Sequence, residues 1–216
     1  MIFDFLESKR HHVKTYKKEA PQKHIIEGAI WKAWKTTPSK NSAMPYQVYV
    51  WRKQKHLDIL YDIAYNNNLD QMSGEPRYNP YFEHIRTAPY LISVHQRASK
   101  PNKFYASRIR NDNLFMEWVH KKDFDQALPG AILEVGMFLA NLTCYLLDEG
   151  IDISYNGCFR RDAVDWQHAG LEMVETRPIT MMSCGYADKY RKDHVNKFEL
   201  EHDKKPEVDE VVQWIE

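Results

Sequence analysis

The sequence has no excess of charge of either sign, because lysine and arginine together number 30 and so do aspartate and glutamate. With a formal net charge of zero, no overall field attracts nucleic acid or an anionic membrane, and any such attraction needs a local patch. Cysteine is scarce as well. Cys144, Cys158 and Cys184 are an odd number without metal-ligand spacing. We therefore expect reduced thiols in a cytoplasmic protein.

Long hydrophobic runs are also missing. The longest apolar segment, Ala131 to Leu147, is interrupted by Glu134 and Asn141, and it falls short of the roughly 20 residues that span a bilayer. The N-terminal segment contains acidic residues and no small-residue cleavage site, so we expect a short helix there rather than a signal peptide. Histidine shows no HxH or HExxH pattern, and no Rossmann glycine fingerprint occurs. We expect no membrane partner and no metal.

What the chain does contain is enough apolar material for one main globular domain, with 43% hydrophobic and 13% aromatic residues among 216. Helical and extended patterns alternate along it, without repeats. This alternation predicts an α+β or α/β layer built on one central sheet. The expected helices are 22–35, 57–64, 129–148 and 163–170, and the expected strands are 46–51, 88–96, 151–159 and 179–186.

The expected helix from Pro129 to Asp148 has almost no polar face. A helix of this kind must be buried on all sides, either inside its own chain or against a second copy. The last nine residues, VDEVVQWIE, are also too apolar for a free end. We therefore expect a main domain at 1–192 and a C-terminal extension at 193–216 that packs on the body or on a partner subunit.

Positive charge is concentrated in one short segment, KRHHVKTYKK, at residues 9–18. Arg10 and Lys14 stand four residues apart with His12 between them. A guanidinium offers forked donors and an ammonium offers a point charge, so together they suit a single phosphate group. A solvated cationic turn is the plainer alternative.

Three further segments contain polar or cationic candidates. They are the loop PSKNSAMPY with Ser39, Asn41 and Ser42, the pair Asn156–Gly157 in SYNGCF, and Lys189 and Arg191 in GYADKYRKD. Taken alone, each segment is more simply a turn or a solvated tail.

Taken together, in this order and at these separations, the four segments resemble the FMN-dependent nitroreductase family. Ala88–Pro89 at the start of a core strand, the apolar helix GAILEVGMFLANLTCYLLDEGI and Gly185–Tyr186 match further motifs of that family. The resemblance covers about residues 2–192. It implies an α+β, nitroreductase-like fold in which helices flank a central, mostly antiparallel sheet, with a long buried helix at 129–148.

The resemblance also implies a set of FMN contacts. Arg10 and Lys14 would hold the phosphate, and Lys189 or Arg191 would provide a second grip. His12 stands where the family usually has a serine. The full implied set is Arg10, His11, His12, Lys14, Asn41, Ser42, Asn156, Gly157, Lys189 and Arg191.

Two of the motifs raise questions about the ring end of the flavin. Asn156 and Gly157 match the pair whose backbone amide faces flavin N5. In PSKNSAMPY, either Asn41 or Ser42 takes the position of the family's asparagine, while a methionine and a tyrosine replace its glutamine and tryptophan. These departures point either to an unusual substrate or to flavin binding without turnover.

Phe115 and Met116 are candidates for an acceptor pocket, with ordinary packing as the alternative. The resemblance implies an NAD(P)H oxidoreductase with a ping-pong cycle, in which nicotinamide delivers hydride to FMN and a small organic acceptor, such as a nitroaromatic or a quinone, then replaces it. The redox chemistry belongs to the flavin, so no catalytic side chain is expected. Family members are generally homodimers with FMN at the interface. A nucleic-acid-binding module that uses the basic segment is the competing hypothesis, which the neutral charge disfavours.

Overall fold

The computed structural model describes residues 12–39, 42–71, 82–97, 124–159, 161, 163–170, 176–190 and 208–212. Its strands are β1 (Val13–Tyr16), β2 (Tyr46–Trp51), β3 (Tyr90–Arg97), β4 (Asp152–Asn156), β5 (Thr176–Gly185) and β6 (Ala187–Tyr190). Its helices are α2 (Lys23–Thr36), α3 (Gln54–Gln71), α4 (Glu83–Thr87), α7 (Phe124–Asp148), α8 (Ala163–His168) and α10 (Val208–Val211).

The centre of the fold is a four-stranded antiparallel sheet with the strand order β2-β3-β5-β4. The middle strand β3 is buried along almost its whole length, because helices cover both of its faces. Its side chains alternate between the two faces, so Ile92 and Val94 enter one apolar cluster and Leu91 enters the other. The expected α+β architecture around a central antiparallel sheet is confirmed.

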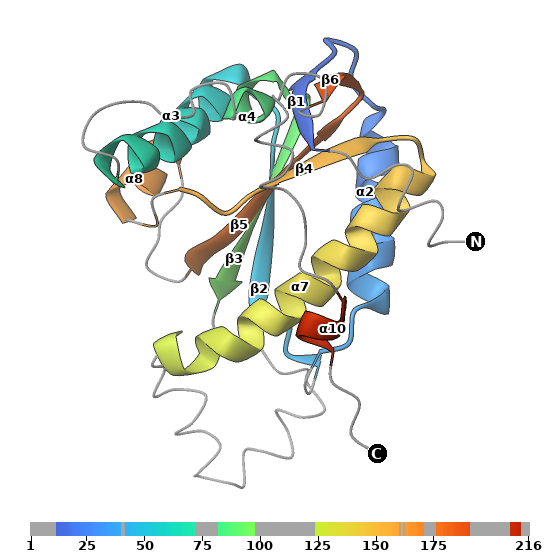
Figure 1. Ribbon diagram of the computed structural model, residues 1–216, viewed down its shortest axis with the longest axis vertical. Coiled ribbons are helices and arrows are strands. Elements are labelled where there is room, and N and C mark those ends of the chain that lie inside the picture. Colours follow the sequence, from blue (N-terminus) through green and yellow to red (C-terminus); the bar gives the residue numbers. More distant parts are fainter. Residues whose placement is uncertain are drawn as a thin grey trace, which may run out of the picture.

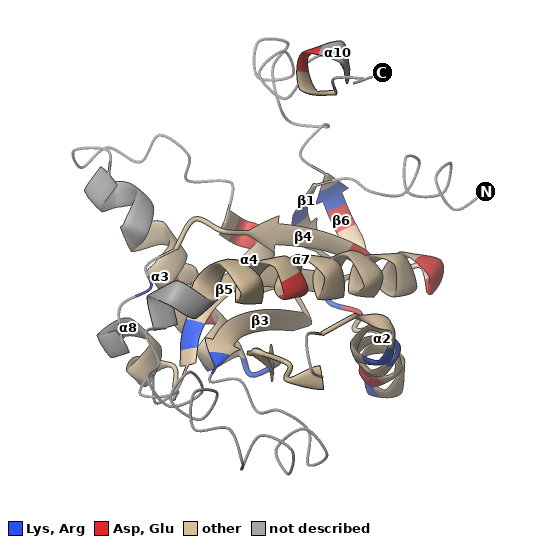
Figure 2. Ribbon diagram, turned by 90° about the horizontal axis from the view of Figure 1, so that it is seen from below, with Lys and Arg blue, Asp and Glu red and all other residues tan. Residues whose placement is uncertain are grey.

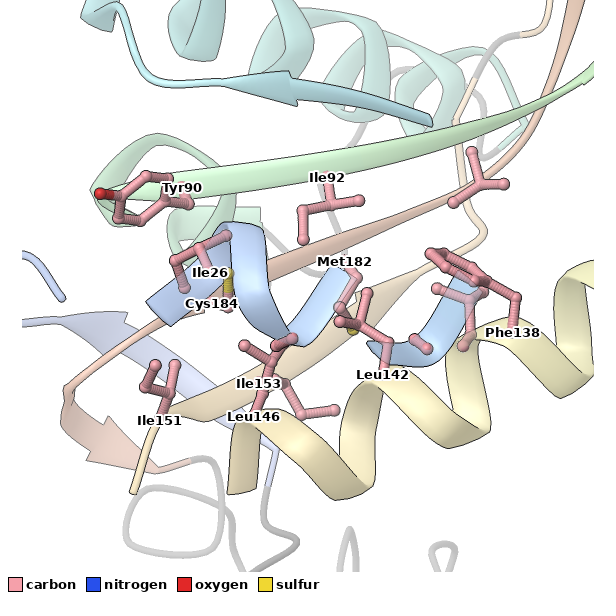
Figure 3. Close-up of a cluster of buried hydrophobic side chains, with 14 of the residues drawn as sticks. Ile26, Tyr90, Ile92, Phe138, Leu142, Leu146, Ile151, Ile153, Met182 and Cys184 are labelled. Atoms are coloured by element: carbon pink, nitrogen blue, oxygen red, sulfur yellow. The ribbon is translucent and has the colours of Figure 1, made fainter. Parts of the chain in front are cut away.

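Helices α2 and α7 cover one face of this sheet, where they pack against each other (Figure 1). Figure 3 shows Phe138, Leu142 and Leu146 of α7 directed toward Ile92 and Met182 of the strands. These five side chains are fully buried. Burial of a side chain of this size contributes about 1.5–3 kcal/mol, so this cluster dominates the stability of the face.

Helices α3, α4 and α8 form the layer on the other face (Figure 1). Leu57 and Leu60 of α3, Ile85 of α4 and Trp166 of α8 are buried there against Leu91. The predicted helix 57–64 therefore exists but extends in both directions, and the predicted helix 163–170 begins where expected.

The long helix α7 differs in two ways from its prediction. It begins at Phe124, so Pro129 lies inside it rather than opening it. Within the single chain it is buried on one side only, because Ile132 and Leu133 are 48% and 65% exposed. Figure 2 shows that this helix is almost free of charged residues. The exposed side is therefore apolar, and the expectation of burial on all sides is not met by one chain alone.

By length and composition, one stretch of α7, Leu128–Asp148, could cross a membrane. Half of it is buried inside the protein, and the core helix of a soluble domain has the same properties.

A second, two-stranded sheet was not anticipated from the sequence. β1 and β6 pair antiparallel, with Val13 opposite Tyr190 and Tyr16 opposite Ala187. Both strands are four residues long and partly polar, so neither has a pattern of its own. Their pairing joins the described parts of the two cationic segments, 12–18 and 185–190, which stand far apart in the sequence.

Candidate functional site

Two of the lysines expected to hold a phosphate lie on these paired strands. Lys14 belongs to β1 and Lys189 to β6, and Thr15, the neighbour of Lys14, stands opposite Lys189. The backbone N–H of Lys17 donates to the carbonyl of Tyr186 at 2.9 Å and extends the pairing by one bond. Figure 2 shows basic residues on both strands. The structure therefore brings together one cation from each of two distant candidate segments.

A buried polar cluster lies directly behind β1. The Tyr16 hydroxyl donates to the backbone carbonyl of Ser183 at 3.0 Å, and the Ser183 hydroxyl donates to the carbonyl of Ser154 at 3.2 Å. Nδ1 of His84 lies 2.8 Å from the Ser183 hydroxyl oxygen. All four side chains are buried. The cluster therefore links β1 and α4 to the two strands β4 and β5.

The Ser183 hydroxyl has three close partners, the Ser154 carbonyl, Nδ1 of His84 and the Tyr16 hydroxyl. When its proton is given to the Ser154 carbonyl, its oxygen accepts from Nδ1 of His84. Burial, with a smaller contribution from His12, lowers the pKa of His84 from 6.5 to about 3. His84 is therefore neutral at physiological pH. Burial raises the pKa of Tyr16, which stays protonated.

His12, which replaces the family's usual serine, is attached to this cluster from outside. Its Nδ1 lies 3.1 Å from the Ser154 hydroxyl oxygen, and its ring meets that of His84 edge-on, with centroids 5.6 Å apart. The residue itself is exposed. The structure thus places His12 at the surface beside Lys14, with a defined orientation set by the polar cluster beneath.

The Asn156–Gly157 loop follows directly from β4. The Asn156 side chain turns back into its own loop, where its Oδ1 accepts the N–H of Cys158 at 2.8 Å. Gly157 is exposed, and a Cβ added to it would meet no atom within 4 Å. Contacts within the chain therefore do not require glycine here, while a flat ligand approaching the backbone would.

Arg161 is a basic residue at this loop that the sequence interpretation did not single out. Its Nη2 donates to the carbonyls of Gly157 at 3.3 Å and Ile179 at 3.4 Å, and its guanidinium lies 4.9 Å from the centre of the Phe159 ring. These two hydrogen bonds connect the glycine loop to β5. The two arginines that follow SYNGCF in the sequence could have indicated this role, since an arginine side chain can make several hydrogen bonds at once.

The PSKNSAMPY loop lies at the other end of the four-stranded sheet. Ser42 and Met44 have positive φ angles of 53° and 43°, and Met44 N–H donates to the Ser39 hydroxyl at 2.9 Å. Arg97, at the far end of β3, donates to the carbonyl of Met44. Because β1 and β6 lie beside the opposite end (Figure 1), one chain does not bring Ser42 together with Lys14 and Lys189.

The remaining predicted site residues lie outside the described residues. They are Arg10, His11, Asn41, Phe115, Met116 and Arg191. Within the described parts of the chain, no group of three or more His, Cys, Asp or Glu side chains could hold a metal ion.

Comparison with known proteins identifies the family. The sequence profile described as "Nitroreductase family" matches residues 8–186, which is most of the chain. The chain belongs to the nitroreductase family. No curated protein sequence matches this family member.

Solved structures share the nitroreductase fold over almost their whole length. A nitroreductase family protein from Streptococcus pneumoniae TIGR4 is 21% identical, with 99% of this chain and 100% of that chain covered and a TM-score of 0.70. A candidate nitroreductase in complex with FMN from Exiguobacterium sibiricum is 12% identical, with 100% and 97% covered and a TM-score of 0.73. A candidate NAD(P)H:FMN oxidoreductase from Staphylococcus epidermidis is 13% identical, with 100% and 96% covered and a TM-score of 0.73.

The described residues fit the cofactor of this family of oxidoreductases. FMN combines an anionic phosphate with a flat ring. Lys14 and Lys189 supply cations on paired strands, and the exposed Gly157 backbone leaves room for a ring. β4 connects the two, since it begins at Asp152 beside β6 and ends next to Gly157.

The buried neutral His84 predicts a specific loss of stability in acid. The unfolded chain takes up a proton near pH 6.5, while the folded chain does so only near pH 3. The free energy of unfolding therefore falls as the pH falls through this window. His84 alone contributes a loss of about 2 kcal/mol between about pH 8 and about pH 5. Urea unfolding at both pH values measures it, and His84→Asn should remove that part of the pH dependence. Identical pH dependence in the two proteins would contradict the assignment.

Proposed function

We propose that the protein is an FMN-dependent NAD(P)H oxidoreductase of the nitroreductase type, with a small organic electron acceptor such as a nitroaromatic or a quinone. The observation that supports this best is the pairing of β1 with β6, which sets Thr15, the neighbour of Lys14, opposite Lys189 at the start of the strand that leads to Gly157. Bound FMN would supply the redox chemistry, by accepting hydride from the nicotinamide and passing it to the acceptor.

The chain's own residues would bind and orient the cofactor. Lys14 and Lys189 would neutralise the phosphate, together with Arg10, His11 and Arg191 as the family resemblance implies. His12, held by Ser154, would contribute from the position just before β1. The Gly157 backbone would face the ring, and Asn156 would shape that loop through its bond to Cys158 rather than contact the ring with its side chain.

A second candidate function is FMN binding without turnover. Its support is the PSKNSAMPY loop, in which methionine stands at the position of the family's glutamine and both Ser42 and Met44 have left-handed backbone conformations. Such conformations are uncommon for residues other than glycine and store strain of about 1–3 kcal/mol each. Met44 offers a thioether to a substrate at the position where the usual family sequence offers an amide.

The visible spectrum of the purified full chain tests the proposal and separates the two candidates. The protein should carry FMN or take it up when FMN is added. Under anaerobic conditions NADH or NADPH should then bleach the flavin absorbance, and a nitroaromatic or a quinone should restore it. Bound flavin that neither nucleotide bleaches would favour the non-catalytic alternative, and protein that takes up no FMN would refute both.

The proposed contacts to the phosphate predict that mutations of two lysines in the same segment change FMN affinity unequally. Lys14→Met removes a cation placed at the phosphate and should weaken FMN binding about tenfold or more, as expected for a charge-assisted contact. Lys18→Met is the matched control, because Lys18 is exposed beyond the end of β1. Titration of flavin-free protein with FMN measures both. Equal affinity of the two variants would remove Lys14 from the site.

We also propose a homodimer with the cofactor at the interface. Two observations support it. The exposed side of α7, with Ile132 and Leu133, is apolar and is available to a second copy. The Ser42 loop, which the family resemblance assigns to the flavin site, lies away from Lys14 within one chain, so a loop from a partner would complete the site. Segment 193–216 would pack on that partner. Its described part exposes Val211 and Val212.

Leu133→Glu should therefore shift the protein from dimer to monomer, because it places a charge in an apolar contact. Analytical ultracentrifugation measures this change as a loss of the dimer over a wide concentration range. Lys55→Glu on α3, which is exposed on the opposite layer, is the control and should leave the dimer intact. A monomeric wild-type protein would contradict the dimer directly.

We expect the protein to act in the cytoplasm. All three cysteines are free, which suits a reducing compartment.

A further inference from the structure

The carboxylate of Asp152 holds both ends of β6. Its Oδ2 accepts the backbone N–H of Ala187 at 2.9 Å, and its Oδ1 accepts the hydroxyl of Tyr190, also at 2.9 Å. Ala187 and Tyr190 are the first and last residues of β6. One side chain from β4 thereby bonds to the first and last residues of the strand that carries Lys189.

β6 depends on such side-chain contacts, because it lies outside the four-stranded sheet. The chain leaves β5 at Gly185 and changes sheet at Tyr186. Gly185 packs closely against a neighbouring segment at this point, since a Cβ on it would come within 2.6 Å of the Pro89 ring. Beyond Tyr186, β6 pairs with β1, and this pairing contains register shifts on either side of Thr15. A two-stranded ladder is only marginally stable by itself.

β4, in contrast, is firmly placed. It pairs with β5 from Asp152 opposite Gly185 to Asn156 opposite Met181 without a register shift. Its far end leads directly to Gly157. Asp152 therefore connects the strand that carries Lys189 to the strand that ends at the glycine loop.

We propose that Asp152 is a positioning residue for the phosphate of bound FMN. Its carboxylate fixes β6, and with it the Lys189 ammonium, relative to the Gly157 loop. This inference rests on the proposed function. The effect comes from geometry rather than from charge, because a carboxylate near a phosphate repels it.

Paired titrations with FMN and riboflavin test the proposal on the flavin-free full chain, because riboflavin lacks the phosphate. The wild type should bind FMN more tightly than riboflavin. Asp152→Ala should weaken FMN binding about tenfold, as expected for the loss of two hydrogen bonds that place a cation, and should change riboflavin binding less than about twofold. Asp152→Asn should stay close to wild type, because its amide can accept from Ala187 and donate to the Tyr190 hydroxyl.

A double mutant tests whether Asp152 acts through Lys189. Lys189→Met should itself reduce the preference for FMN, and adding Asp152→Ala should weaken FMN binding no further. Additive losses would overturn the proposal. So would equal losses for FMN and riboflavin, which indicate general damage, or Asp152→Ala binding FMN like wild type.

Two results separate this inference from the proposed function, and a further variant covers poor folding. A wild type that binds no flavin would overturn the function and the inference together. A wild type that prefers FMN, with Asp152→Ala unchanged, would overturn only the inference. If Asp152→Ala fails to fold, Tyr190→Phe removes one of the two bonds and should weaken FMN binding about threefold while sparing riboflavin.

Discussion

The antiparallel pairing of β1 with β6 is the contact on which the candidate site depends. These strands come from opposite ends of the main domain, and each carries one of the lysines assigned to the phosphate. Nothing in their composition would hold them together in isolation, because a lone two-stranded ribbon is only marginally stable in water. They persist because side chains attach them to the body. Tyr16 reaches Ser183 from β1, and Asp152 reaches Ala187 and Tyr190 of β6.

The attachment of β1 through Tyr16 is polar and buried, whereas the Asp152 contacts to β6 are only partly buried. Ser183, His84 and Ser154 are almost inaccessible to water, so each donor and acceptor must find its partner within the cluster. A buried network of this kind is sensitive to geometry, since an unpaired member would lose free energy on desolvation. The network fixes the position of β1. It also orients the ring of His12, which contacts Ser154 and His84 at the outer edge of the network. The surface proposed to bind the phosphate is thus positioned by buried groups beneath it.

The apolar clusters on the two faces of the sheet have a different role. Phe138 and Leu142 of α7 and Trp166 of α8 supply the hydrophobic burial that holds the layers together. α7 does so with one side only, and its other side presents Ile132 and Leu133 to solvent in the single chain. One side of α7 therefore packs in the core of its own chain, and the other side is an apolar surface of the kind that a second copy can cover. The separation of the Ser42 loop from Lys14 is consistent with a site completed by two chains.

The sequence by itself determined the elements whose side chains follow a period. Helix α2, strand β2 and strand β3 were predicted within a few residues, because an amphipathic helix and a strand rich in β-formers are local patterns. It also indicated the family, from the order of short motifs. Only the tertiary structure decided the contacts of Asp152, His84 and Ser183, and the existence of β1 and β6. These features consist of contacts between residues far apart in the chain, so no local pattern could reveal them.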